Sequence, residues 1–493
     1  MATETLPSAP EAAGIKGIEV RSIDWVPENE RHGKLWHQLP LWFLGNFQYF
    51  SIPIGFVGPA FGLSLWYTIL AGTLGILIGT VFMAFHATQG PTLGLPQMIQ
   101  SRAQFGYRGV IIALFAVLFT YLAFNVADQV LMSEGLNGTF GWNKNVIAIV
   151  TAIGAALLAI YGHDWVHRVF RGLLYILLPL MTIITIGVLT GHAGYVPSKA
   201  SFGFNWTGFM AQLSAAAAYN ITYAPYVSDY SRYLPKNTAR GKLIASVFAG
   251  ASTPAIWLIA LGAWLAIRLG AVDPLVGLQT AGNNMFSHLG SVTAFVSATA
   301  LAATMGMNAY GGMLTTLTGI DAFRKINPTR MVRIVTILGL TVIWYVVAKA
   351  ITTNAVGAVY GSLTLMLYLL VPWTATNLID FFFVRRGHYA ITDLFRIDGI
   401  YGVWAWRGLV AYAVGFAVEI PFMYIYNLFT FKTYYEGPFA KDLNNVDIAW
   451  IAGLIATSIT YVIVTRSFNP ASEQAAIEES ERELAAASAP VTV

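Results

Sequence analysis

Three polar side chains share one face of a long apolar stretch that begins near Tyr107. Tyr121, Asn125 and Gln129 are spaced four residues apart, so an α-helix brings them to the same side. An amide offers hydrogen-bond donors and acceptors together, and a tyrosine ring offers a face for stacking. This pattern favours binding of a flat heterocycle with a mixed polar edge. Hydrogen bonding between neighbouring helices is the alternative explanation for each residue.

A second apolar stretch, which begins near His288, carries Thr299, Thr304 and Asn308. Polar groups inside apolar membrane helices are costly, so each of them is a candidate for function. Asn308 adds a second amide to the predicted site, and the two threonines add hydroxyl oxygens.

Three acidic residues lie in or beside apolar stretches. Asp128 is a candidate for a proton-linked carboxylate, with pairing to arginine or to backbone as the alternative. Asp229 is a second candidate, but Arg232 and Lys236 follow it closely, which favours a structural ion pair. Glu419 lies in a later stretch and is not expected to contact the solute.

Two apolar stretches are interrupted by proline, which removes a backbone donor and clashes with the preceding helical turn. The first reads GNFQYFSIPIGFVGPAFG and contains Pro53, and the second reads AYNITYAPYVSDYSRYLP and contains Pro225. Transporters commonly bind solute where paired helices break near the midplane of the membrane. The polar residues beside these two breaks, which we add to the predicted site, are Gln48, Ser51, Asn220 and Tyr223.

The composition explains why these residues lie within a membrane. Of 493 residues, 56% are hydrophobic and only 11% are charged, whereas soluble domains carry roughly 25% charged residues. A span of the hydrocarbon layer needs roughly 20 apolar residues. We therefore expect about twelve transmembrane helices, which begin near Trp36, Leu63, Tyr107, Asn145, Arg168, Asn205, Leu243, His288, Arg330, Val356, Val403 and Val446.

The positive charges test this count and set the orientation. With the amino terminus inside, alternation places 22 of the 28 lysines and arginines on inside segments. Positive residues are enriched on the cytoplasmic side of membrane proteins. The sequence thus predicts a multi-pass membrane protein with both termini in the cytoplasm.

Several other functions lack the residues they need. The chain has no cysteine, which excludes disulfides, cysteine-ligated metals and thiol catalysis. His163 and His167 have a spacing that suits a metal, but further ligands are lacking, so no metal site is predicted. Neither a phosphate-binding loop nor a nucleophile–base pair is found, and we predict neither ATP-driven transport nor an enzyme.

Five segments together resemble the nucleobase–cation symporter 1 family, and specifically its purine–cytosine permease-like branch. They are GIEVRSIDWVPENERHGK, LWFLGNFQYFSIPIGFVGPAFGLS, QMIQSRAQFGYRG, YVSDYSRYLP and MNAYGGMLTTLTG, and they span Gly17 to about Gly319. The resemblance implies an all-α, five-plus-five inverted-repeat fold of the leucine-transporter type with two extra helices. It also implies alternating access, with the solute held between the first, third, sixth and eighth helices.

This fold divides the chain into five parts. The two repeats are expected over residues 35–192 and 204–384, and the two additional helices over residues 403–466. Cytoplasmic tails are expected over residues 1–34 and 467–493, and the carboxyl-terminal tail, rich in Glu and Ala, is expected to be a solvated helix.

The resemblance also assigns individual contacts. It places a polar contact at Ser51, the helix-three aromatic at Tyr121 with its amide at Asn125, the helix-six aromatic at Tyr223 and the helix-eight amide at Asn308. The hydantoin branch of the family has tryptophan at both aromatic positions, so the tyrosines here predict a roomier pocket.

The coupling ion is predicted from a second difference between this sequence and its relatives. The sodium-coupled relative lines its cation site with hydroxyl side chains, whereas the matching positions here are Ala302 and Ala303, and Thr299 and Thr304 are offset. Sodium prefers oxygen ligands, so the sequence favours protons over sodium. The candidates for cation coupling are Asp128, Asp229, Thr299 and Thr304.

These observations predict a symporter in the bacterial inner membrane that imports cytosine, a purine or a hydantoin- or allantoin-like heterocycle. The alternative is a transporter of the same fold for amino acids or other zwitterions. We predict no cofactor beyond the coupling cation, no nucleic-acid partner and no obligate protein partner.

Overall fold

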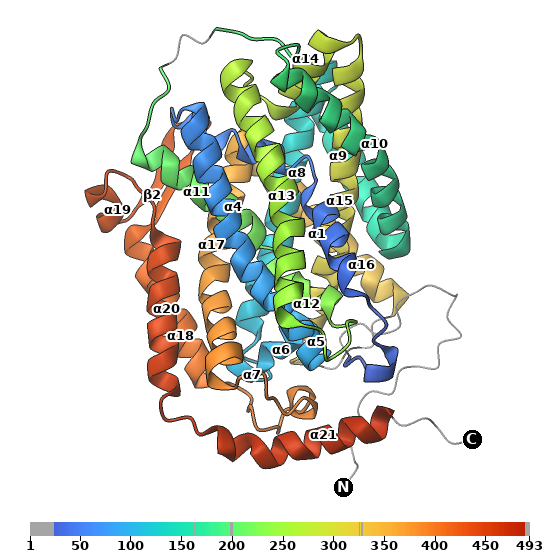
Figure 1. The fold of residues 1–493 in the computed structure, drawn as a ribbon, viewed down its shortest axis with the longest axis vertical. Helices are drawn as coiled ribbons and strands as arrows, with labels where there is room; N and C mark the ends of the chain where they lie inside the picture. The colour runs from blue at the N-terminus through green and yellow to red at the C-terminus, as the bar shows by residue number, and fades with distance from the viewer. Residues whose placement is uncertain (1–23, 162, 198–200, 325, 327–328, 489–493) are drawn as a thin grey trace.

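The computed structural model describes residues 24–161, 163–197, 201–324, 326 and 329–488. Long helices run roughly parallel through the molecule, and one helix lies across one end of it (Figure 1). This all-α architecture agrees with the predicted fold class.

Seven helices in the described part of the chain are long and apolar enough to cross a membrane. Each begins within a few residues of a predicted span. They are α4 (Leu65–Ala87), α8 (Ile111–Phe140), α9 (Lys144–Tyr161), α13 (Arg240–Arg268), α15 (Leu289–Asp321), α16 (Arg330–Ala350) and α17 (Ala355–Ile379).

The other five predicted spans also contain helices, but these are broken, shorter or only partly described. The first and sixth spans are broken, as predicted. The helices are α1 (Gln38–Asn46), α2 (Ser51–Ile54) and α3 (Val57–Ala60); α10 (His163–Leu189); α11 (Trp206–Ile221) and α12 (Ala224–Ser231); α18 (Trp406–Glu419); and α20 (Ala449–Thr465).

Both breaks precede their prolines rather than fall on them. Helix α1 ends at Asn46, and Pro53 lies inside α2, while Pro225 is the second residue of α12. A proline is tolerated in the first turn of a helix because the amide hydrogens there have no intrahelical partner. At the first break, side chains supply partners for backbone carbonyls at the end of α1, since Gly45 accepts from Gln48 and Tyr223.

The sequence did not predict several short elements between the spans. They are α5 (Gln89–Leu93), α6 (Gln97–Gln100), α7 (Arg102–Phe105), α14 (Pro274–Met285), the antiparallel strands β1 (Tyr424–Asn427) and β2 (Lys432–Glu436), α19 (Pro438–Asp442), the π-helical turn η3 (Asp380–Val384) and the 3-10 turns Glu28–Glu30, Leu35–His37, Thr392–Phe395, Ile420–Phe422 and Pro470–Glu473. The helix expected in the carboxyl-terminal tail is α21 (Gln474–Ser488).

Close packing of small residues fixes the position of the broken sixth span. A β-carbon added at Gly75 would lie 2.2 Å from the Leu213 carbonyl oxygen, and one added at Gly79 would lie 2.3 Å from that of Ala217. Helix α4 therefore contacts the backbone of α11 directly. Small residues allow this approach between membrane helices.

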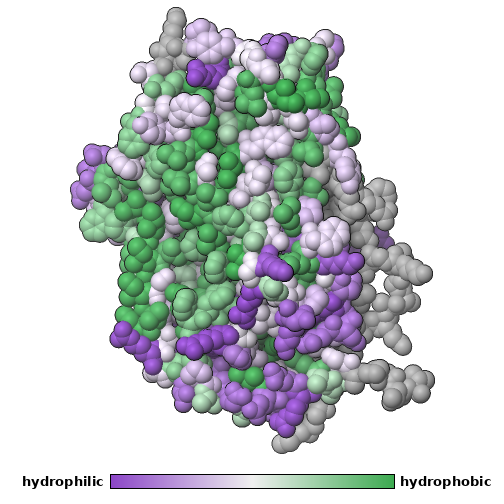
Figure 2. Space-filling view, in the orientation of Figure 1, coloured by the Kyte–Doolittle hydropathy of each residue, from purple (hydrophilic) through white to green (hydrophobic). Residues whose placement is uncertain are grey.

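Helix α21 and the short helices α5, α6 and α7 lie at one end of the molecule, which we call the terminal face (Figure 1). The surface at this end is largely hydrophilic, whereas the middle of the molecule is mostly hydrophobic (Figure 2). This distribution is typical of a protein that spans a bilayer.

Helix α21 is docked on the terminal face, and the expectation of a solvated tail is wrong for its inner side. Arg385 donates to both Glu473 carboxylate oxygens at 2.9 Å and to Asp380 at 2.7 Å. Ile477 and Leu484 of α21 are both buried in one hydrophobic cluster. The buried side of α21 needs the loop after α17 as its partner, and composition alone does not show that partner.

Candidate solute-binding site

The two predicted amides meet in the middle of the helix bundle. Asn308 of α15 donates from Nδ2 to Oδ1 of Asn125 of α8 at 3.1 Å, and Asn125 donates to the Met305 carbonyl at 3.1 Å. Asn125 is only 1% exposed. The third and eighth spans are thus joined at the residues that sequence spacing and resemblance had selected.

One turn toward the terminal face, the Tyr121 ring lies against α15. A β-carbon added at Gly311 would lie 2.4 Å from the Tyr121 ring, so only glycine leaves room for the ring at this distance. Gly311 follows Asn308 by three residues and lies on the same side of the helix. The Tyr121 ring therefore lies next to the Asn125–Asn308 pair, which we call the amide layer.

One turn in the other direction, the break in the first span reaches α15. Thr304 donates from Oγ1 to Gln48 Oε1 at 2.9 Å, and Gln48 Nε2 donates to the Gly45 carbonyl at 2.8 Å. Ser51 is fully buried and donates to the Asn46 carbonyl at 3.1 Å. Gln48 and Thr304 thus lie together, while Ser51 satisfies a carbonyl at the end of α1.

The break in the sixth span brings Tyr223 to the first span but directs Asn220 elsewhere. The Tyr223 hydroxyl donates to the Gly45 carbonyl at 3.0 Å. Asn220 is buried and donates to Thr80 of α4 at 2.6 Å. The structure therefore does not place Asn220 with the amide pair.

Among the cation candidates, Asp128 is a buried acid on α8. It is 1% exposed, and neither carboxylate oxygen has a hydrogen-bond partner within the described part of the chain. It follows Asn125 by three residues on α8.

The remaining cation candidates are separated from one another. Asp229 accepts from the Gln97 backbone amide at 2.9 Å, next to the terminal face. Thr299 donates to the Phe295 carbonyl at 2.9 Å, and Phe295 is 51% exposed. Only Thr304 lies beside the amide layer, through its bond to Gln48.

Gln129 does not join the site, although its spacing matched Tyr121 and Asn125. It donates to Thr151 of α9 at 3.1 Å. Within the described residues, no group of three or more metal-ligating side chains gathers. The side chains of His163 and His167 lie outside the described residues.

Two aromatic residues that the sequence analysis had not selected also contact the site. The Tyr219 ring stacks on Phe50 of the first break at 5.8 Å, and Tyr226 lies 5.0 Å from Tyr121, centroid to centroid. Tyr226 follows Tyr223 by three residues, and this helical spacing could have identified it.

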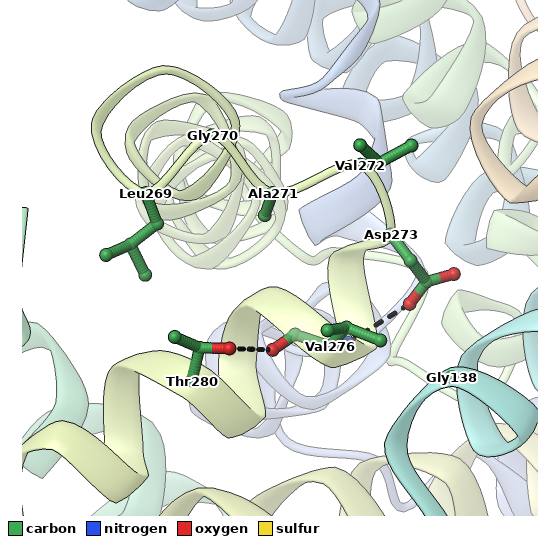
Figure 3. Close-up of a pocket in the computed structure, with 8 residues that line it drawn as sticks. All are labelled: Gly138, Leu269, Gly270, Ala271, Val272, Asp273, Val276 and Thr280. Atoms are coloured by element: carbon green, nitrogen blue, oxygen red, sulfur yellow. Dashed lines mark hydrogen bonds between the residues drawn. The ribbon is translucent and has the colours of Figure 1, made fainter. Parts of the chain in front are cut away.

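A separate cavity of about 420 Å³ is lined by the connection between α13 and α14, by α14 itself and by the end of α8 (Figure 3). Helix α14 lies at the end opposite the terminal face (Figure 1). Asp273 lines it and caps α14 by accepting from the Leu275 and Val276 amides at 2.8 and 3.1 Å. Burial raises the pKa of Asp273 to about 6. This cavity does not include the amide layer.

Comparisons with known proteins identify the family and the fold. The profile of the family described as permeases for cytosine/purines, uracil, thiamine and allantoin matches residues 25–446. The chain is 34% identical over 452 residues to a Bacillus subtilis (strain 168) protein provisionally named a purine-cytosine permease, and the match covers 91% of this chain and 96% of that one. A Saccharomyces cerevisiae purine-cytosine permease is 25% identical over 274 residues, about half of each chain.

Two solved structures of Mhp1 share the fold. The inward-facing conformation superposes with a TM-score of 0.71 at 18% identity, and covers 95% of this chain and 97% of that one. A closed conformation, described as a nucleobase-cation-symport-1 family transporter with bromovinylhydantoin bound, has a TM-score of 0.69 at 18% identity over 93% of this chain and 98% of that one. On these grounds, the chain is a membrane transporter and belongs to the nucleobase–cation symporter 1 family.

Proposed function

We propose that the protein imports a nucleobase or a related flat heterocycle, such as cytosine, a purine, a hydantoin or allantoin, by cation-coupled alternating access. The observation that carries this proposal is the direct bond between Asn125 and Asn308, with the Tyr121 ring one turn away on Gly311. The names of the Bacillus and yeast relatives, and the hydantoin bound to Mhp1, support the same class of solute.

The amide pair suits the polar edge of a heterocycle. Each asparagine has an oxygen that accepts and a nitrogen that donates two hydrogens. A solute edge that offers one donor and one acceptor can therefore replace the bond between the two amides, so neither is left unsatisfied. Tyr121 and Tyr223 would supply ring faces for stacking, and Gln48 and Ser51 line the break in the first span.

We propose that a proton is the coupling ion and that Asp128 carries it. A neutral carboxyl group costs much less to bury than an ionised one, and Asp128 has no hydrogen-bond partner among the described residues. Protonation would allow this carboxyl group to remain buried while the bundle closes. Thr304, whose hydroxyl lies 2.9 Å from Gln48 Oε1, is the alternative oxygen ligand for sodium.

We also propose that the terminal face is cytoplasmic, with the chain in the bacterial inner membrane. The excess of lysine and arginine on the segments at this end supports the orientation. In this arrangement the two repeats would cover residues 35–192 and 204–384, and α18 and α20 would be the two additional helices.

The experiment is uptake of radiolabelled cytosine, uracil, hypoxanthine, adenine and allantoin into proteoliposomes. Each solute is tested under a proton gradient alone and under a sodium gradient alone. We expect one compound to accumulate under the proton gradient and a protonophore to abolish that accumulation. Accumulation of amino acids in place of every heterocycle would overturn the proposed solute class. Accumulation under the sodium gradient alone would overturn the proposed ion.

Variants of Asp128 test the proton carrier separately. Asp128→Asn keeps the size of the side chain but cannot release a proton, so we expect solute exchange to continue while proton-driven accumulation is lost. Asp273→Asn, a matched change at the cavity outside the site, should leave accumulation intact. Unchanged accumulation in Asp128→Asn would remove Asp128 from the coupling step.

A further inference from the structure

Tyr226 connects the two predicted stacking aromatics. Its ring centroid lies 5.0 Å from that of Tyr121, with the ring planes at 54°, and 6.2 Å from that of Tyr223 in an edge-on arrangement. Tyr226 and Tyr223 belong to the broken sixth span, whereas Tyr121 belongs to α8. The contact between Tyr121 and Tyr226 therefore joins two separate helices beside the amide layer.

This contact lies between the amide layer and the terminal face. Helix α8 starts directly after α7 at that face, and Tyr121 is four residues nearer this start than Asn125. Helix α15 runs toward the terminal face, and Gly311 comes three residues after Asn308 along it. The Tyr121 ring lies against Gly311, so this contact is also on the side of the terminal face. A solute held at Asn125 and Asn308 would have to pass this aromatic pair to reach the terminal face.

Helix α12, which carries Tyr226, is anchored to the end of α4 and to the short helices that follow it. Ser228 donates to the His86 carbonyl at 3.0 Å, and Ser231 donates to the Ala87 carbonyl at 2.7 Å. Asp229 accepts from the Gln97 amide at 2.9 Å. These bonds make α12 part of the group formed by α4, α5 and α6.

Tyr121 belongs to a different packing group. Helix α8 packs mainly on α15 and α17, while α12 packs on α4, α5 and α6. The Tyr121–Tyr226 ring contact therefore crosses from one group to the other. Any movement that opens a path to the terminal face between these groups must separate the two rings.

We propose that Tyr226, with Tyr121, forms the gate that closes the solute site toward the terminal face, and that Gly311 sets where the Tyr121 half of this gate lies. The proposal rests on the proposed function for the identity of the solute, but the gate itself can be tested without any solute. Tyr226 acts here as a positioning residue that holds the closed state, and it forms no part of the amide layer.

The absence of cysteine from the chain makes a direct accessibility test possible. Thr304→Cys places a single thiol on the far side of the amide layer from the terminal face. A membrane-impermeant methanethiosulfonate reagent is applied to vesicles with the terminal face outward, and the rate of thiol modification is measured. The same measurement is made with Tyr226→Ala or Tyr226→Phe added.

Removing the ring should weaken the closed state and speed modification. Loss of one aromatic pair corresponds to a population shift of about threefold to tenfold, so we expect Tyr226→Ala to raise the rate by that factor. Tyr226→Phe retains the ring and should keep the parent rate. Tyr175→Ala, which removes an exposed tyrosine on α10, should also keep it. Equal rates in Tyr226→Ala and the parent would overturn the gate.

Solute binding and accumulation give a second readout once a solute is known. In Tyr226→Ala we expect the solute Kd to stay within about threefold of the parent value while gradient-driven accumulation falls at least about fivefold, because the solute leaks back. Loss of binding as large as in Asn308→Ala would make Tyr226 a solute contact and overturn its role as a gate. Failure of every heterocycle to bind would overturn the proposed function and leave the thiol result to decide on the gate. If Tyr226→Ala does not fold, as judged by size-exclusion chromatography, Tyr226→Leu takes its place.

Discussion

The side-chain amide of Asn308 donates to Asn125 Oδ1 across 3.1 Å, and this bond joins α15 to α8 in the middle of the bundle. Asn125 is nearly fully buried and also donates to a backbone carbonyl of α15. Two spans that are far apart in sequence thus present a donor and an acceptor side by side.

Replacement of either amide should weaken solute binding. A solute hydrogen bond in a buried site contributes about 1 to 3 kcal/mol when its loss leaves a polar group unpaired. Asn125→Ala and Asn308→Ala should therefore raise the transport constant about tenfold to a hundredfold, with normal amounts of protein in the membrane. Gln129→Ala is the matched control, because Gln129 bonds to Thr151 instead. Unchanged uptake in both site variants would remove the amides from the site.

Gly311→Ala should disturb the site through Tyr121 alone. The added β-carbon would lie 2.4 Å from the Tyr121 ring, a distance that forces the ring to move. We expect the transport constant to rise about threefold to tenfold, because a displaced ring loses a stacking contact worth about 0.5 to 1.5 kcal/mol.

A double-mutant cycle identifies the cause of the Gly311 effect. In a Tyr121→Ala background, which leaves room for the new methyl group, Gly311→Ala should have little further effect. Additive losses would mean that Gly311 acts through a group other than the Tyr121 ring.

The sequence selected Asn125 and Asn308, which the structure brings into contact, but it did not predict the partner of every candidate residue. The four-residue spacing of Tyr121 and Asn125 and the position of Pro225 close to Tyr223 are local features, so the sequence shows them directly. The partner of each polar group depends on how neighbouring helices are rotated and on how closely they approach. For this reason Asn220 was assigned to the site although it bonds to Thr80 of α4.

The same limit applies to the fold. Long apolar runs locate the spans because burial in lipid requires length and composition only. Helix α21 could be predicted as a helix, but its docking depends on Arg385, which lies far from it in the sequence. The break positions also differ by a few residues from the prolines, because proline fits within the first turn of the following helix.

The docking of α21 should contribute measurably to stability. Arg385 bridges Asp380 and Glu473 with little exposure, and although burial disfavours its charge, the two carboxylates raise the pKa of Arg385 well above its usual value. Removing one partner of a buried pair costs about 3 kcal/mol or more, so Arg385→Ala should lower the melting temperature of the detergent-solubilised protein. Glu473→Gln should have a smaller effect in the same direction.

Glu483→Gln is the control on the same helix. Glu483 pairs with Arg396 at 2.8 Å, but both side chains are about a third exposed, and exposed pairs contribute about 0 to 1 kcal/mol. Its melting temperature should stay close to that of the parent. Equal melting temperatures for Arg385→Ala and the parent would show that the docked helix does not stabilise the fold.

Asp273 should make the stability of the fold depend on pH. Burial is the largest cause that raises its pKa from 3.8 to about 6, and nearby Glu134 adds to the increase. The folded protein therefore binds more protons than the unfolded chain between about pH 4 and pH 6, so stability decreases as the pH rises through this window. Asp273→Asn keeps an oxygen that can accept from the Leu275 and Val276 amides but does not titrate. Relative to this variant, the melting temperature of the parent should fall from pH 4 to pH 6 and change little from pH 6 to pH 8. Melting curves of both proteins over this range test the prediction, and a constant difference between them would contradict it.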